Sequence, residues 1–151
     1  MQLPAHNTPQ FEWGRTRMPR QPQPVPPIFE PEVAARAIEW AAHHRRRQLY
    51  VGWPTVQAIV GNKLAPGLAD RYLARTGVDA QQTDEPVDPA RPDNLFESVA
   101  GDFGARGRFS AESRERSLLL EATLRRGRLA AAGAAAAGGL LAAFLARRGR
   151  D

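Results

Sequence analysis

The sequence predicts a mainly α-helical chain with long coil segments and one or two short strands. Three observations lead to this fold class. Apolar residues recur at helical spacing in several separate stretches. Proline and glycine, 13 of each among 151 residues, interrupt the chain between those stretches. An Ala-rich run without charged or polar side chains lies near the C-terminus and predicts a long helix there.

The N-terminal part is rich in proline, because eight of the 13 prolines lie within residues 1–31. Proline fixes φ and removes an amide donor, so we expect residues 9–30 to be coil with extended or polyproline II stretches. Such a segment serves as a linker or crosses a protein surface as a long loop. Residues 1–10 have neither a basic start nor an apolar run, which is unlike a secretory signal peptide.

A helix is predicted over residues 31–46, followed by a short strand over 48–52. Pro31 suits a first helical position, and acidic side chains beside it suit the positive end of the helix dipole. The apolar stripe of this helix comprises Val33, Ala34, Ala37, Ile38 and Ala41. Arg45, Arg46 and Arg47 would stand at its negative end. A single strand leaves backbone groups unpaired, so we expect residues 48–52 to pair with residues 1–5.

Two more helices are predicted over residues 54–64 and 66–76, separated at Pro66-Gly67. Residues 78–109 show no sustained periodicity and contain many acidic residues, prolines and glycines, so we expect coil there. Leu95, Phe96 and Phe103 are the side chains in this coil that could dock on a surface.

The last predicted helix runs over residues 111–148, with Ser110 as its N-cap. Residues 129–146 are ten Ala, four Leu, three Gly and one Phe, flanked by Arg125, Arg126 and Arg128 before and by Arg147, Arg148 and Arg150 after. At 1.5 Å per residue the run spans about 27 Å, close to the hydrocarbon core of a bilayer. It is a candidate transmembrane segment on an otherwise cytoplasmic protein. A soluble Ala-rich helix and a disordered tail are the alternatives.

Charge and composition limit the classes of function. The net charge is +5 over residues 1–78, −6 over residues 79–102 and +6 over residues 103–151. The basic residues are dispersed and almost all are Arg, which argues against nucleic acid as a partner. The chain has no Cys and only three His, which leaves no thiol nucleophile and no set of metal ligands.

Residues 2–11, Gln-Leu-Pro-Ala-His-Asn-Thr-Pro-Gln-Phe, resemble the segment that follows the catalytic helix in the short-chain dehydrogenase/reductase family. In that family a strand ends in Pro-Gly-x-Val-x-Thr, and the Thr lies by the nicotinamide carboxamide of NAD(P). Thr8 matches this Thr, whereas Leu3-Pro4 replaces Pro-Gly and His6 replaces the aliphatic residue. The resemblance makes Thr8 a cofactor-binding residue.

The same family order continues along about half of the chain. Residues 9–30 look like its substrate-side loop, residues 31–38 resemble its Pro-Glu-x-Val-Ala helix, residues 48–52 look like its last parallel strand and residues 54–76 resemble an added helical extension. The fold therefore resembles the C-terminal fragment of a Rossmann-type α/β fold. We expect three parts: residues 1–77 as the family-like portion, 78–109 as an acidic linker and 110–151 as a long helix.

Two family features are missing from the 151 residues: the Gly-rich cofactor turn and the catalytic Tyr-x-x-x-Lys. We therefore expect no catalytic residue and no cofactor for this chain alone, although the resemblance implies NAD or NADP for the full-length family. The chain would be a truncated gene product, the result of a misplaced start codon or one piece of a split protein. A missing N-terminal Rossmann half, a second copy or a membrane would be its partner. The alternative is a non-enzymatic, membrane-anchored interaction protein that binds through its polyproline loop and acidic coil.

Overall fold

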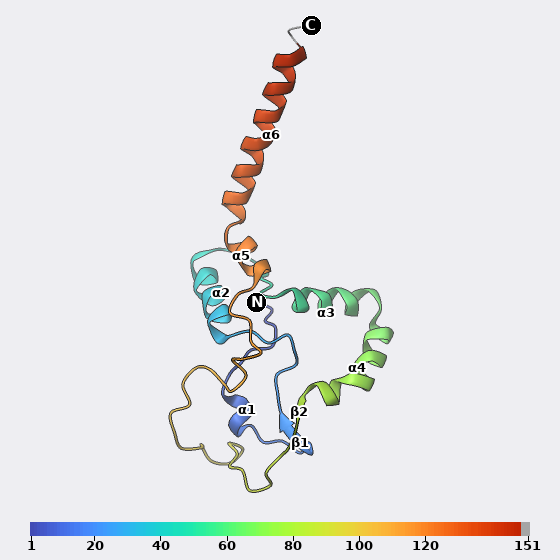
Figure 1. Cartoon of the computed structure of the whole chain (residues 1–151), viewed down its shortest axis with the longest axis vertical. Coiled ribbons are helices and arrows are strands. Elements are labelled where there is room, and N and C mark those ends of the chain that lie inside the picture. The colour runs from blue at the N-terminus through green and yellow to red at the C-terminus, as the bar shows by residue number, and fades with distance from the viewer. Residues whose placement is uncertain (149–151) are drawn as a thin grey trace.

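The computed structural model describes residues 1–148 and is mainly helical. A small body carries a long helix that projects from one end, and a pair of helices forms an arm at its side (Figure 1). In chain order the elements are α1 (Gln10–Trp13), β1 (Arg20–Pro22), α2 (Pro31–His43), α3 (Trp53–Leu64), α4 (Pro66–Ala80), β2 (Gln82–Pro86), α5 (Leu118–Leu124) and α6 (Arg126–Arg148). The predicted fold class, mainly helical with few and short strands, is confirmed.

The core lies between α2, the segment that follows it and α5. Its buried side chains are Phe29, Val33, Ala37, Leu49, Val51 and Leu120. From α2 it is Val33 and Ala37 that are buried, whereas Ile38, which the predicted stripe included, is 56% exposed. The core is small because α3 and α4 contribute no buried residue to it.

The predicted strand over residues 48–52 is reduced to one parallel bridge between Tyr50 and Gln2. The Gln2 amide donates to the Leu49 carbonyl at 2.8 Å, and the Val51 amide donates to the Gln2 carbonyl at 3.0 Å. The expected pairing with residues 1–5 is therefore confirmed, in shorter form. These two segments lie side by side although the whole of α2 separates them in the sequence.

The prediction of uninterrupted coil over residues 9–30 and 78–109 is wrong, because each range contributes one strand to a two-stranded antiparallel sheet. β1 pairs with β2, with Arg20 opposite Pro86 and Pro22 opposite Gln82. The range 9–30 also contains the single turn α1. Helix α4 ends at Ala80, four residues later than predicted, and leads directly into β2.

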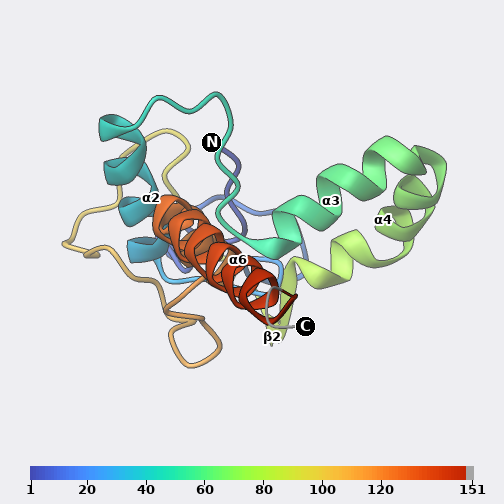
Figure 2. The ribbon, with the colours of Figure 1, turned by 90° about the horizontal axis from the view of Figure 1, so that it is seen from above.

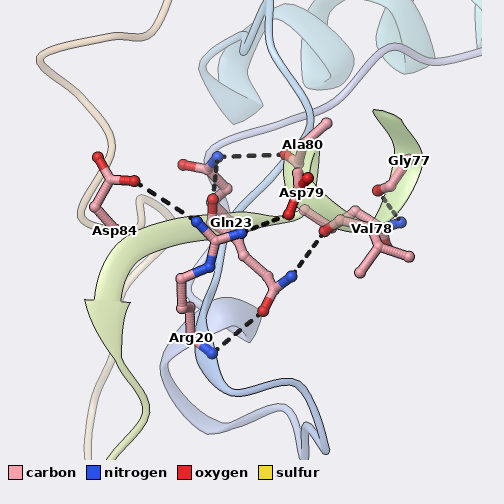
Figure 3. A network of polar contacts seen from close by, with 9 residues as sticks. Arg20, Gln23, Gly77, Val78, Asp79, Ala80 and Asp84 are labelled. Atoms are coloured by element: carbon pink, nitrogen blue, oxygen red, sulfur yellow. Dashed lines mark hydrogen bonds and ion pairs between the residues drawn. The ribbon is translucent and has the colours of Figure 1, made fainter. Parts of the chain in front are cut away.

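Hydrogen bonds and ion pairs of polar side chains, rather than apolar packing, hold this small sheet to the end of α4 (Figure 3). Arg20 Nη2 donates to Asp79 at 2.6 Å, and its other terminal nitrogen lies 3.7 Å from Asp84. Gln23 Nε2 donates to the carbonyls of Ala80 and Gln82, at 3.3 and 2.8 Å. Periodicity could not reveal this pairing, because β1 and β2 consist almost entirely of polar residues and proline.

The predicted helix over residues 111–148 is also wrong at its start, which lies at Leu118, and it is divided at Arg125 into α5 and α6. The N-cap is Ser117 rather than Ser110: the Ser117 hydroxyl accepts from the Leu120 amide at 3.2 Å and donates to the Val51 carbonyl. Before it, residues 108–112 lie in turns and Arg114 forms a parallel bridge with Phe29, so no helix begins at Ser110.

Helix α2 ends at His43 rather than at residue 46, so the three following arginines do not stand in its last turn. The His44 amide closes the helix on the Ala41 carbonyl at 3.4 Å. Arg45, Arg46 and Arg47 lie beyond this cap in an exposed loop. Seen from above, α2 lies beside the base of α6, and the α3–α4 arm extends toward the other side (Figure 2).

Candidate functional site

The N-terminal residues 1–8 carry the positions that the sequence singled out. Their backbone is fixed by neighbours on both sides of α2: Gln2 is held by residues 49–51, and the Phe29 amide donates to the Ala5 carbonyl at 2.9 Å. The Asn7 amide in turn donates to the Phe29 carbonyl at 2.8 Å. An extended chain tethered in this way places His6 and Thr8 at the edge of one pocket.

This pocket is an open hollow of about 500 Å³. Its walls come from the N-terminal segment, the proline-rich loop and the first turns of α2, with Gln81 at the end of α4. The lining residues are Leu3, Pro4, Ala5, His6, Thr8, Gln10, Phe11, Gln23, Pro24, Val25, Pro31, Ala34 and Gln81. The lining combines apolar side chains with amide and hydroxyl groups, a combination that suits a flat polar ring. His6 is the titratable side chain among these residues.

His6 is half-buried, and its Nδ1 lies 2.8 Å from the Pro4 carbonyl. A carbonyl oxygen only accepts, so Nδ1 carries the proton and Nε2 is the acceptor. Burial lowers the pKa of His6, and the bond to Pro4 opposes this effect only in part. The Nε2 atom is buried and has no hydrogen-bond partner within residues 1–148. The ring is therefore neutral at pH 7, with an unused acceptor.

Thr8 is half-buried, and its amide donates to the His6 carbonyl at 3.0 Å. Its carbonyl is covered by Gly107, where an added Cβ would lie 2.7 Å from the Thr8 oxygen. Only glycine allows such a close approach. Thr8 lines the pocket, and its hydroxyl makes no hydrogen bond to another residue in the part of the chain that the structure describes.

Asn7 anchors this segment and was not identified from the sequence. Its side chain is completely buried and donates to Ser110 at 2.9 Å and to Glu30 at 3.2 Å. Its Oδ1 accepts from the Phe109 amide at 3.0 Å. A single Asn between His and Thr gives no sequence signal, because the partners that bury it lie 23 and more than 100 residues away.

Among the described residues, the pocket lining contains one titratable side chain, His6. Neither a carboxylate nor a lysine is among its lining residues. In residues 1–148, no group of three His, Asp or Glu could hold a metal ion. The lowered pKa values of Glu32 and Glu121 arise from hydrogen bonds to Arg106 and Arg36, outside the pocket. His6 is therefore the one side chain of this lining that titrates near neutral pH.

Helix α6 is a second feature of functional interest, because it packs against almost nothing. Its window Arg126–Phe144 has a mean hydropathy of 1.4, is 0% buried and is long and apolar enough to cross a membrane. Leu140 is 74% exposed and Phe144 is 57% exposed. Arg150, which the sequence places in the second Arg cluster, lies outside the described residues.

The chain resembles one oxidoreductase. Over 120 residues it is 30% identical to the uncharacterized oxidoreductase YxnA of Bacillus subtilis (strain 168), a match that covers 79% of this chain and 33% of that protein. The matched part thus spans about a third of the length of its relative. No family model matches the chain, and no solved structure matches it. The chain is therefore similar to a part of an oxidoreductase.

Proposed function

We propose that this chain forms the C-terminal part of an NAD(P)-dependent oxidoreductase of the short-chain dehydrogenase/reductase type. The observation that carries the proposal is the similarity to an oxidoreductase over 120 residues. The order of motifs from Thr8 through the Pro31-Glu32 helix start to the segment at residues 48–52 is what favours this family in the proposal.

The backbone arrangement supports this proposal. Residues 1–3 and 49–51 run parallel, and the connection between them contains helix α2. A parallel pair joined through a helix is the β-α-β unit from which doubly wound sheets are built. Such sheets bind their ligands beyond the carboxyl ends of the strands, and His6 and Thr8 follow the first of these segments.

The pocket fits one end of the cofactor. Thr8 would bind the nicotinamide carboxamide, because its free hydroxyl can both donate and accept. Apolar atoms of Leu3, Pro4 and Phe11 would cover the ring and exclude water. NAD or NADP would supply the hydride acceptor or donor. The phosphates find no glycine-rich cradle in this sequence, so their site must come from residues outside this chain.

The reaction also needs groups that this chain does not supply. The family's catalytic Tyr-x-x-x-Lys is absent from the sequence. In this proposal an N-terminal Rossmann half contributes both the phosphate site and the acid–base pair, whereas the present chain contributes the nicotinamide end and the substrate-side loop. The isolated chain should therefore transfer no hydride.

The coding DNA upstream of Met1 tests the missing half. We expect an in-frame Gly-x-x-x-Gly-x-Gly followed by Tyr-x-x-x-Lys shortly before Met1. An in-frame stop codon with a ribosome-binding site close to Met1 would contradict the proposal.

Calorimetry tests the cofactor assignment. We expect no heat of binding when the isolated chain is titrated with NADH or NADPH up to about millimolar concentration, the range of the weakest binding usually measured. Micromolar binding by the isolated chain would show that a phosphate site exists within these residues.

A second candidate function is that of a non-enzymatic, membrane-anchored interaction protein, and the exposure of α6 favours it. An apolar helix that the body leaves completely uncovered has a surface suited to lipid. We infer that residues 129–146 anchor a cytoplasmic body to a membrane. Fractionation tests this: the chain should stay in the membrane pellet after a carbonate wash and become soluble when residues 129–146 are deleted.

A further inference from the structure

Basic side chains from two distant parts of the chain meet where α6 leaves the body. The Arg126 guanidinium lies 5.8 Å from the centre of the Trp40 ring, which joins the first turn of α6 to the last turn of α2. His44 stacks on the same Trp40 ring, with ring centres 4.1 Å apart. The loop with Arg45, Arg46 and Arg47 follows His44 directly, so it begins next to this contact.

We call these residues the collar: Arg45, Arg46, Arg47, Arg125, Arg126 and Arg128. All six are exposed. The nearest carboxylate, Glu121, is shared between Arg125 at 3.3 Å and Arg36 at 2.5 Å. Within the described residues the other five collar arginines form no ion pair, so the collar keeps its positive charge.

The opposite end of the body is acidic. Residues 79–102, with a net charge of −6, include β2 and the loop after it, which lie at the end of the body remote from α6 (Figure 1). The loop after α2 instead lies at the level of α5, at the end from which α6 projects. Arg15 and Arg20 pair with Asp93, Asp79 and Asp84 at the acidic end and neutralise part of its charge. The root of the apolar helix, by contrast, carries arginines without an ion pair among the described residues.

We propose that the collar binds the headgroups of anionic phospholipids and seats this end of the body on the bilayer that α6 enters. The inference rests on the proposed membrane anchoring. Arginines close to a membrane surface are attracted by anionic lipids, and a Trp side chain such as Trp40 suits the headgroup level. The acidic end would be repelled from the same surface and held away from it.

A nucleic acid is the other polyanion that such a collar could bind. Two observations favour the bilayer. The collar arginines Arg125, Arg126 and Arg128 stand at the start of an apolar helix, which nucleic acid has no means to cover. Apolar side chains also stand among the arginines, with Leu118 86% exposed and Leu129 56% exposed. An apolar surface within a cationic ring is complementary to an anionic membrane.

Flotation of the purified full chain with vesicles tests the proposal. One set of vesicles is phosphatidylcholine, and the other contains phosphatidylglycerol in addition. The collar variant carries Arg45→Gln, Arg47→Gln and Arg128→Gln. The control carries Arg17→Gln, Arg71→Gln and Arg75→Gln, which removes the same charge at exposed sites away from the collar.

We expect the control to prefer anionic vesicles as the unchanged chain does. The collar variant should lose this preference by about a hundredfold, since each arginine near the surface contributes about fivefold, and should bind neutral vesicles as before. If both variants lose the same amount, or neither loses any, the collar is not the lipid site. If the collar variant loses affinity for duplex DNA but not for anionic vesicles, the proposal is overturned in favour of nucleic acid.

The anchoring proposal can fail separately. Binding to anionic vesicles only, abolished by salt and by the collar substitutions, would support the collar and contradict insertion of α6. Binding to neutral and anionic vesicles with equal strength would support insertion and contradict the collar.

Discussion

The core around α2 and the helix α6 differ in what holds them. In the core, Leu120, Val33 and Val51 are at most 1% exposed, and Asn7 beside them has all its polar atoms paired. Helix α6 carries leucine and phenylalanine side chains in its C-terminal half, yet Leu140 there is 74% exposed. Contacts between side chains hold the core, whereas backbone hydrogen bonds and the helix propensity of Ala hold α6.

The apolar residues that stabilise the fold and those that are exposed therefore lie in different parts of the chain. Apolar residues that the body needs are buried by the body itself. Those of α6 are not buried by the body, and in our proposal a membrane covers them. Substitutions of the same type in the two regions should therefore change the free energy of unfolding by different amounts or in opposite directions.

The largest expected effect comes from Leu120→Ala, compared with Leu140→Ala. Removing the buried Leu120 side chain should lower the free energy of unfolding by about 2–5 kcal/mol. The same change at Leu140 should alter it by no more than about 0.5 kcal/mol. Denaturant titration of the two variants measures both. Equal losses would mean that α6 packs on the body in solution.

Glycine gives the next comparison. At Gly107 a methyl group would lie 2.7 Å from the Thr8 carbonyl oxygen and 2.8 Å from Asn7 Oδ1, so Gly107→Ala should destabilise the body by about 1–3 kcal/mol. At Gly133 nothing lies within 4 Å, and Gly133→Ala should stabilise α6 by about 0.5–1 kcal/mol. Thermal unfolding and helix content by circular dichroism check the two signs. A harmless Gly107→Ala would contradict the close approach to Thr8.

The smallest effect concerns pH. Burial keeps the pKa of His6 in the folded chain below its ordinary value of 6.5, so the unfolded chain binds the proton more readily. The resulting stability is complete above that value and is lost as the pH falls through the lower pKa of the folded state.

Stability of the body should therefore decrease on acidification below about pH 6.5, and His6→Asn should make this decrease smaller. The Asn side chain keeps an amide donor for the Pro4 carbonyl but does not titrate in this range. His43→Asn, at an exposed position, serves as the control. The measurement is the free energy of unfolding at several pH values. If this free energy changes with pH by the same slope in all three proteins, His6 is not the source of the decrease.

The sequence predicted the elements that neighbouring residues determine. Proline at a first helical position placed the start of α2 at Pro31, and the interruption at Pro66-Gly67 separated α3 from α4. The uniform Ala-rich run predicted α6. The pairing of residues 1–5 with 48–52 also followed, because a lone strand needs a partner.

The features that sequence reasoning missed depend on distant partners. Ser110 and Ser117 are equally good N-caps by residue type, and only the Val51 carbonyl and the bridge at Arg114 make Ser117 the one used. Thr8 was singled out by resemblance, whereas Asn7 and Gly107, which position it, gain their roles from contacts across some 100 residues. The role of Thr8 itself stays a prediction.

The central claim is that α6 is built for a bilayer and the body is not. Its most direct test places one charge in the middle of the run, at Ala137→Asp, and the same charge near its end, at Ala130→Asp. Both positions are exposed, so neither change disturbs the body. A charge at the centre of a membrane-spanning helix costs about 2.5–3.5 kcal/mol, and much less near the interface.

The measurement is the fraction of each full-length protein that remains with membranes after a carbonate wash. We predict that the unchanged chain and Ala130→Asp stay in the pellet and that Ala137→Asp moves to the supernatant. Release of the unchanged chain by salt alone, or identical behaviour of the two Asp variants, would contradict the claim.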